Sequence, residues 1–147
     1  ALKQLSIGCA SSAGKAWIHS GGQTTDQYTL WEHCAEQDTF LEAMADAAST
    51  VTKHFAGKIA YVAVMKNLSV DCDCCAVAED PCMNDVGILS SLDPVALDRA
   101  CIDLVRNSND PGRDHFMERV NSRHGTHTID AAEALGIGTQ DYELVRV

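Results

Sequence analysis

The alternation of apolar and polar positions divides the middle of the chain into one helix and two strands. Apolar residues recur at helical spacing from Thr39 to His54, with Asp38 as a cap and Gly57 as a stop. The segment Ile59–Met65 is a continuous apolar run, which is typical of a strand covered on both faces of a parallel sheet. A second short apolar strand is predicted at Asp85–Leu89.

The two ends of the chain extend this pattern of strands and helices. We expect short strands at Leu2–Ile7 and Ala16–Ile18, around a glycine-containing turn. Asp93 and Pro94 are expected to begin a helix that reaches about Asn107. The other expected elements are a helix capped by Asp114 and ending before Gly125, a short helix containing Ile129, Ala132 and Leu135, and a closing strand at Tyr142–Val147.

Strands that alternate with helices predict a layered α/β fold with a mainly parallel sheet flanked by helices. A length of 147 residues fits a single α/β domain over residues 1–147. The chain starts at Ala1 without an initiator Met, so we expect it to be the carboxyl-terminal part of a longer protein.

Composition and charge narrow the classes of partner. A formal net charge of −10 opposes binding to phosphate backbones, and the basic residues are scattered, so nucleic acid is excluded as a partner. No apolar run approaches the roughly 18 residues that span a bilayer, so no membrane partner is expected. Because no secretory signal precedes the domain, the expected compartment is the cytoplasm, where grouped cysteines bind metal or carry out redox chemistry.

The chemically distinctive segment is Asp71-Cys72-Asp73-Cys74-Cys75. In an extended chain, Cys72 and Cys74 would point to the same side. The flanking carboxylates disfavour free thiolates, whereas a bound cation would stabilise thiolates and carboxylates together. The cluster therefore predicts a metal site, with Cys72 and Cys74 as ligands and with Asp71 and Asp73 beside the cofactor.

The spacing of the cysteines leaves the identity of the metal open. Thiolates favour zinc, iron or an iron–sulfur cluster. A standard ferredoxin run and a pair of C-x-x-C knuckles are both missing from this sequence. The expected cofactor is an iron–sulfur cluster or zinc. The sequence leaves open the roles of Cys9, Cys34, Cys75 and Cys82, whereas Cys101 lies in an apolar helical stripe and is expected in the core.

Three histidines are candidates to complete the metal shell. His124 and His127 bracket Gly125 and could present two imidazoles from a helix end. Structural stabilisation by the helix dipole is the alternative for these two residues. His19, at the end of a predicted strand, is the third candidate.

Lys15 and Asp85 are further candidates for cofactor binding. Lys15 follows the glycine-containing segment Gly8–Gly14, whose spacing does not match a phosphate-binding loop, but the lysine could still lie beside a ligand. Asp85 stands at a strand start directly after the cysteine loop and has no obvious structural partner.

The stretches Val64–Cys74 and Asp85–Asp98 resemble the iron–sulfur centre proteins of the domain-of-unknown-function-362 family. Leu2–His19, Arg119–His127 and Gly136–Leu144 are similar to the carboxyl-terminal half of that family. The resemblance implies an iron–sulfur centre and a longer protein. Many family members carry an inserted ferredoxin-like module, which this sequence does not match, and this departure favours an unusual mixed site.

Three functions follow from these observations. The leading hypothesis is a metal- or iron–sulfur-binding protein with a Cys/Asp/His site, for which a redox role with an electron-transfer protein as partner is one expectation. The second is a hydrolase or transferase that depends on zinc or another metal, with Asp71, Asp73 or Asp85 as a base and a small molecule as substrate. The third is a non-catalytic domain in which a metal holds the loop in place.

Overall fold

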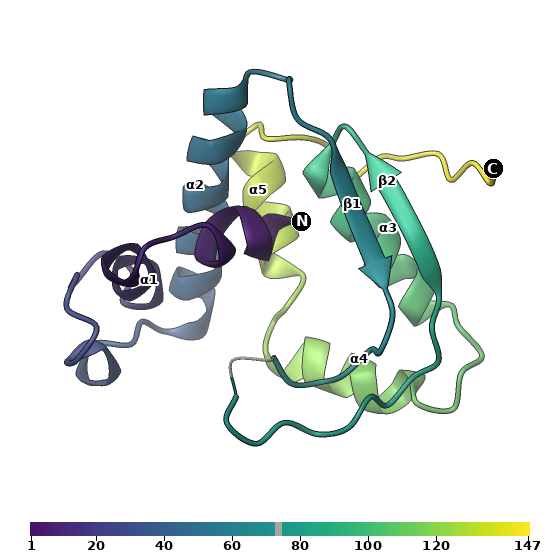
Figure 1. Cartoon of the computed structure of the whole chain (residues 1–147), viewed down its shortest axis with the longest axis horizontal. Coiled ribbons are helices and arrows are strands. Elements are labelled where there is room, and N and C mark those ends of the chain that lie inside the picture. Colours follow the sequence, from purple (N-terminus) through teal and green to yellow (C-terminus); the bar gives the residue numbers. More distant parts are fainter. Residues whose placement is uncertain (73–74) are drawn as a thin grey trace.

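The computed structural model describes residues 1–72 and 75–147 (Figure 1). Helices make up most of the regular structure, and the described residues form a single sheet of two strands. In chain order the elements are η1 (Gln4–Gly8), α1 (Ser12–His19), η2 (Leu30–Glu32), α2 (Gln37–Phe55), β1 (Tyr61–Met65), β2 (Gly87–Ser91), α3 (Pro94–Arg106), α4 (Arg113–Ser122) and α5 (His127–Ala134).

The predicted layered fold with a mainly parallel sheet is wrong. Strands β1 and β2 are antiparallel, with Tyr61 opposite Ser91 and Met65 opposite Gly87. Neighbouring parallel strands need a long crossover connection, which is usually a helix. The described residues between β1 and β2 contain no helix, so the chain returns as a long hairpin.

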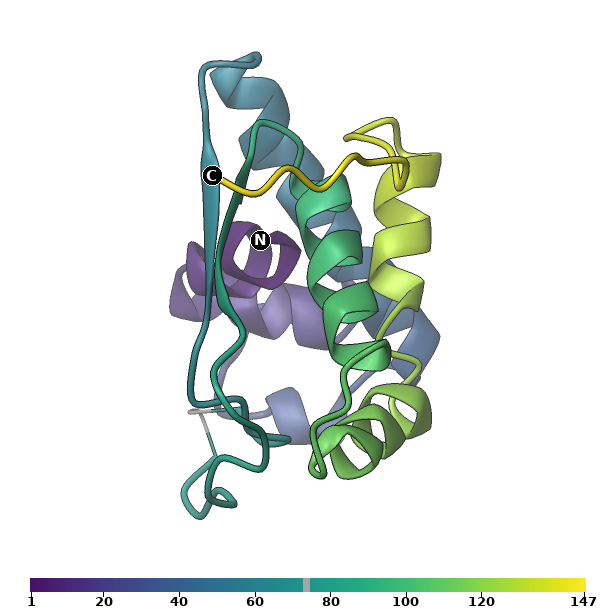
Figure 2. The same ribbon diagram turned by 90° about the vertical axis from the view of Figure 1, so that its right-hand side faces the viewer.

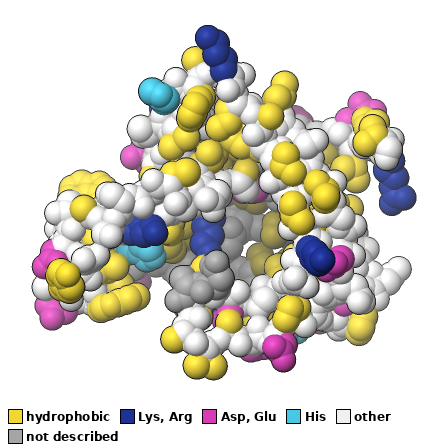
Figure 3. All heavy atoms as spheres, in the orientation of Figure 1, with side chains coloured by type: hydrophobic (Ala, Val, Ile, Leu, Met, Phe, Trp, Pro, Cys, Tyr) yellow, Lys and Arg dark blue, Asp and Glu magenta, His cyan; other side chains and the backbone are white. Residues whose placement is uncertain are grey.

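The sheet also has one uncovered face, contrary to the expectation that β1 is buried on both sides. Tyr61 and Met65 point into the molecule and are 7% and 6% exposed, whereas Val62 and Val64 are 64% and 62% exposed. Helices α3, α4 and α5 lie on one side of the sheet (Figure 2), and hydrophobic side chains gather over its outer face (Figure 3). Apolar composition on both sides of a strand therefore did not predict burial on both sides.

The core lies between the inner face of the sheet and helices α2, α3 and α5. Its fully buried members include Ala48 of α2, Val95 of α3 and Ala132 of α5. The predicted helices in these three regions are confirmed. The predicted cap of α3 is confirmed as well, because Asp93 Oδ1 accepts the N–H groups of Val95 and Ala96 at 2.8 and 3.0 Å.

The amino-terminal region is helical, so the strands predicted at Leu2–Ile7 and Ala16–Ile18 are wrong. A π-helix, η1, occupies the first segment, and α1 contains the second. Leu2 and Leu5 are both buried, and residues three apart lie on the same face of a helix, whereas they lie on opposite faces of a regular strand. The missed signal is Ser11, whose side chain caps α1 by accepting the N–H of Gly14 at 3.2 Å.

Three smaller predictions are also corrected. Asp38 is not the cap of α2, because the helix begins earlier and Glu36 occupies the cap position. Asp114 lies inside the first turn of α4, where Gly112 is the cap. Residues Tyr142–Val147 form no strand. None of the described helices combines the length and the apolar character that a membrane crossing requires.

Candidate functional site

The cysteine segment lies on the connection between β1 and β2, and the base of this connection is held by backbone pairing. Leu68 and Met83 form an isolated antiparallel bridge, and the N–H of Cys82 donates to Leu68 O at 2.8 Å. Asp85 Oδ1 accepts the N–H of Asn67 at 2.9 Å. Asp85, predicted as a site residue, thus has a structural partner at the end of β1.

Asp71 fixes the next part of the connection. Its carboxylate accepts the backbone N–H of Glu79 at 3.0 Å and the guanidinium of Arg119, on α4, at 2.6 Å. Ser69 Oγ donates to Glu79 O at 3.0 Å. The Glu79 backbone N–H, and then Arg119, hold the pKa of Asp71 below its usual value. Asp71 is therefore a charged anchor for the loop, and a carboxylate stabilised in this way is a poor general base.

Cys72 and Cys75 are joined by the backbone hydrogen bond that is typical of a tight turn. The N–H of Cys75 donates to Cys72 O at 2.9 Å, which is the hydrogen bond that closes a four-residue turn. The two cysteines thus have the C-x-x-C spacing of a metal-binding knuckle. The predicted pairing of Cys72 with Cys74 stays a prediction, because Asp73 and Cys74 lie outside the described residues.

Lys3, near the amino terminus, places a positive charge beside this turn. Its Nζ lies 2.8 Å from Cys72 Sγ, across a sequence separation of 69 residues. Lys3 is held in place by its neighbour Leu2, which is 1% exposed and whose N–H donates to Asp98 Oδ2 at 2.8 Å. The ammonium group is thus a charged hydrogen-bond donor to this sulfur. No local sequence signal could have linked Lys3 to Cys72.

Both cysteines open into one small cavity between the turn and α4. Its volume is about 350 Å³, which is within the range of ligand sites. One wall comes from the loop and the other from Phe116 and Arg119 of α4. Arg123 was not predicted as a site residue, but it also lines the cavity. The full lining is Ser69, Val70, Asp71, Cys72, Cys75, Phe116, Arg119, Val120 and Arg123.

The predicted histidine ligands His124 and His127 pair with carboxylates of α2. His124 Nδ1 lies 2.7 Å from Asp38 Oδ1, and His127 Nε2 lies 3.0 Å from Glu42 Oε1. These contacts connect the start of α2 to the chain around the start of α5. Among the described residues, no group of three or more His, Cys, Asp or Glu side chains is arranged to hold a metal ion.

His19 and Lys15 lie together on α1, away from the lining of the cysteine cavity. His19 Nδ1 is 2.8 Å from Lys15 O, and its ring stacks on Phe40 with 4.9 Å between the centroids. The Lys15 side chain is exposed. The structure therefore gives both residues positions on the α1 surface and does not bring them to Cys72.

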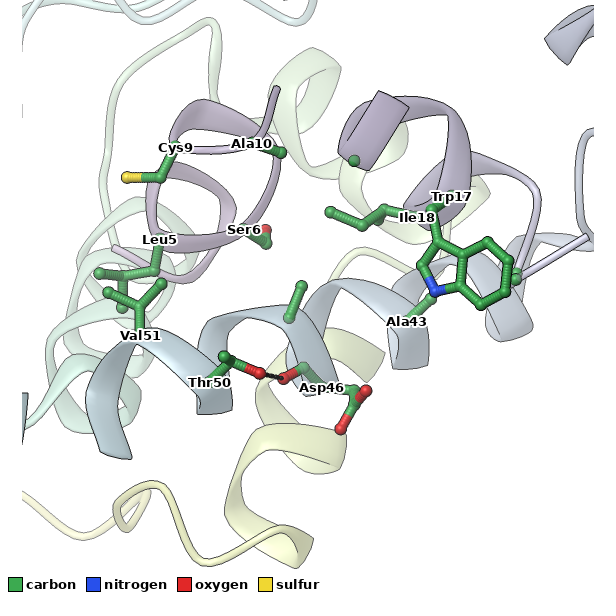
Figure 4. A pocket seen from close by; sticks show the side chains of 14 residues that line it. Leu5, Ser6, Cys9, Ala10, Trp17, Ile18, Ala43, Asp46, Thr50 and Val51 are labelled. Atoms are coloured by element: carbon green, nitrogen blue, oxygen red, sulfur yellow. Dashed lines mark hydrogen bonds between the residues drawn. The ribbon is translucent and has the colours of Figure 1, made fainter. Parts of the chain in front are cut away.

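A second cavity, of about 530 Å³, lies between η1, α1 and α2 (Figure 4). Cys9 and Trp17 lie on its η1 and α1 sides, and Asp46 lies on the α2 side. None of the residues predicted from the sequence as site residues lines this cavity. Cys9 is exposed here and provides a comparison thiol outside the turn.

Three further cysteines, Cys82, Cys101 and Cys34, lie outside the cysteine turn. Cys82 packs against the core cluster that contains Met83 and Val105. Cys101 is partly buried on α3, and its burial, with a smaller effect of Asp98, raises the pKa of the thiol to about 11. Cys34 is exposed, with its sulfur 3.6 Å from Leu30 O. The cysteine turn is thus the place where two of the described thiols face one cavity.

Comparison with known proteins identifies a family. Residues 1–103 match the sequence profile of the domain of unknown function DUF362. This match includes the cysteine turn and ends within α3, before α4 and α5. No curated protein and no solved structure matches the chain significantly. The chain belongs to the DUF362 family.

Proposed function

We propose that the Cys72–Cys75 turn is a thiolate site that binds zinc or an iron–sulfur cluster. The observation that carries this proposal is the pairing of two cysteines at C-x-x-C spacing. A backbone hydrogen bond joins them, and both line a single cavity. Thiolates select zinc and iron–sulfur clusters over hard cations such as Mg²⁺.

The donor set fits a soft metal and leaves part of the shell open. Cys72 and Cys75 supply two thiolates from the described residues, and Cys74 is the third sulfur ligand expected from the sequence. A zinc ion with three protein ligands keeps one position for water or substrate. An iron–sulfur cluster takes four protein ligands, so this cofactor would require a donor from outside the turn.

The charged groups around the turn support a bound thiolate centre. Lys3 lies against Cys72 Sγ, and Arg119 neutralises Asp71. Hydrogen bonds and positive charge at ligating sulfurs tune metal affinity and reduction potential. Because Asp71 is held as a charged anchor, it is not available as the base that a hydrolase would need. These features favour metal binding or electron transfer, with an electron-transfer protein as partner.

Metal analysis of protein purified without air tests the proposal. We expect zinc, or iron with acid-labile sulfide, in the wild-type chain. Cys75→Ser should lose most of the bound metal, whereas Cys9→Ser, which removes an exposed thiol outside the turn, should retain it. Zinc without sulfide identifies a zinc site, and iron with sulfide identifies a cluster. Equal metal content in all three proteins, or none in the wild type, would exclude the turn as the site.

A further inference from the structure

The geometry of the turn suits a covalent bond between its two sulfurs. A hydrogen-bonded four-residue turn keeps its end Cα atoms within about 7 Å of each other. A disulfide needs Cα atoms about 4.4–6.8 Å apart. The bond from Cys75 N–H to Cys72 O closes such a turn, and both side chains line the same cavity.

The surroundings of the two sulfurs differ in a way that suits stepwise thiol–disulfide exchange. Cys75 is exposed and is open to a reagent from solvent. Cys72 is partly covered and contacts the Lys3 ammonium. Arg119 pairs with the carboxylate of Asp71, the residue before Cys72. The other described cysteines have no such arrangement of two thiols and a cation.

We infer that Cys72 and Cys75 form a reversible disulfide that switches off metal binding at this site. The disulfide depends only on the turn, whereas its effect on metal rests on the proposed function. Formation of the bond converts two anionic ligands into a neutral disulfide, which is a poor metal ligand. The same two residues would thus hold metal when reduced and release it when oxidised.

The oxidant is a low-molecular-weight disulfide, and the exchange takes two steps. The Cys75 thiolate attacks one sulfur of the reagent, so its S–S bond breaks, one thiolate leaves and a mixed disulfide forms on Cys75. The Cys72 thiolate then attacks Cys75 Sγ, which forms the Cys72–Cys75 bond and expels the second thiolate. The two cysteine thiols lose two protons and two electrons in total, and the reagent takes up both electrons.

Mass spectrometry of metal-free protein treated with oxidised glutathione tests the disulfide. The wild type should lose the mass of two hydrogen atoms in the peptide that contains the turn. Cys75→Ser and Cys72→Ser should lack this closure, and their remaining turn thiol should retain a glutathione adduct. Cys74→Ser and Cys82→Ser should still close. Failure of the wild type to close, or loss of closure in Cys74→Ser, would overturn the inference.

Cobalt(II) binding before and after oxidation tests the switch. The reduced protein should show thiolate-to-cobalt absorption, the oxidised protein should bind at least about tenfold less cobalt, and reduction with dithiothreitol should restore binding. Equal cobalt binding by the reduced and oxidised proteins would overturn the switch but leave the metal site intact. A reduced protein that forms the disulfide but binds no cobalt, zinc or iron would instead overturn the proposed function.

Discussion

The helical core and the loop that carries the cysteine turn are stabilised by different interactions. In the core, side chains such as Val95 and Leu97 are almost fully buried, and burial of each contributes about 1.5–3 kcal/mol. The part of the loop around Asp71 is held by polar and charged contacts, through the Glu79 backbone and the partly exposed Arg119 guanidinium. We therefore expect changes at Asp71 and its partners to affect the loop more than the core.

The largest expected effect comes from a cavity in the core. Leu97→Ala should lower the free energy of unfolding by about 2–5 kcal/mol, because Leu97 is 2% exposed and packs in the main cluster. Val77→Ala, in the loop, should change it by less than about 0.5 kcal/mol, because Val77 is 91% exposed. Urea denaturation measures both. Similar losses for the two variants would contradict the division between core and loop.

Removal of the α4 contact should release the loop without unfolding the core. Arg119→Ala deletes the ion pair with Asp71, so hydrogen exchange should accelerate in residues 69–79 while the melting temperature falls by much less than in Leu97→Ala. Arg113→Ala is the matched control, because the ion pair that it deletes is with the neighbouring Asp114 on α4. Faster exchange throughout the core of Arg119→Ala would show that the loop and the core are coupled.

Acid should loosen the loop through Asp71. The folded pKa of this carboxyl lies below its ordinary value of 3.8, so its contribution is fully present above that value and is lost as the pH falls through the folded pKa. Hydrogen exchange in residues 69–79 should therefore increase in that acid range. Asp71→Asn should show fast exchange at neutral pH already and a flatter pH profile. An unchanged profile in this variant would exclude Asp71 as the anchor.

The smallest expected effect concerns Lys3. Lys3→Met should weaken cobalt(II) binding by about tenfold, because Lys3 lies against the ligand sulfur and does not itself bind metal. Lys15→Met, which removes an exposed lysine of α1, should leave the affinity unchanged. Optical titration of the two variants gives both affinities. Equal affinities would mean that the contact between Lys3 and Cys72 has no role in metal binding.

Local signals in the sequence predicted the elements that depend on local interactions. Helix α3 was predicted with its cap, because Asp93 and Pro94 act on the next few N–H groups. The sheet was predicted incorrectly, because a continuous apolar run does not determine the direction of the neighbouring strand. Nor does it determine whether another element covers Val62 and Val64. Strand direction is decided by the connection, which the apolar pattern does not describe.

The candidate site shows the same limit. The cysteine segment is recognisable from composition, and the alternation of an extended chain indicates Cys72 with Cys74, which lies outside the described residues, whereas the described hydrogen bond joins Cys72 to Cys75. The C-x-x-C spacing was visible in the sequence and is the signal that could have indicated this pair. Lys3 and Arg119 could not be predicted, because only the tertiary fold brings them to the loop.

X-ray absorption spectroscopy of the zinc-loaded, reduced protein tests the metal site most directly. We expect at least two sulfur ligands at about 2.3 Å, and the loss of one of them in Cys75→Ser but not in Cys9→Ser. A first shell of only nitrogen and oxygen at about 2.0–2.2 Å would contradict a thiolate site at this turn.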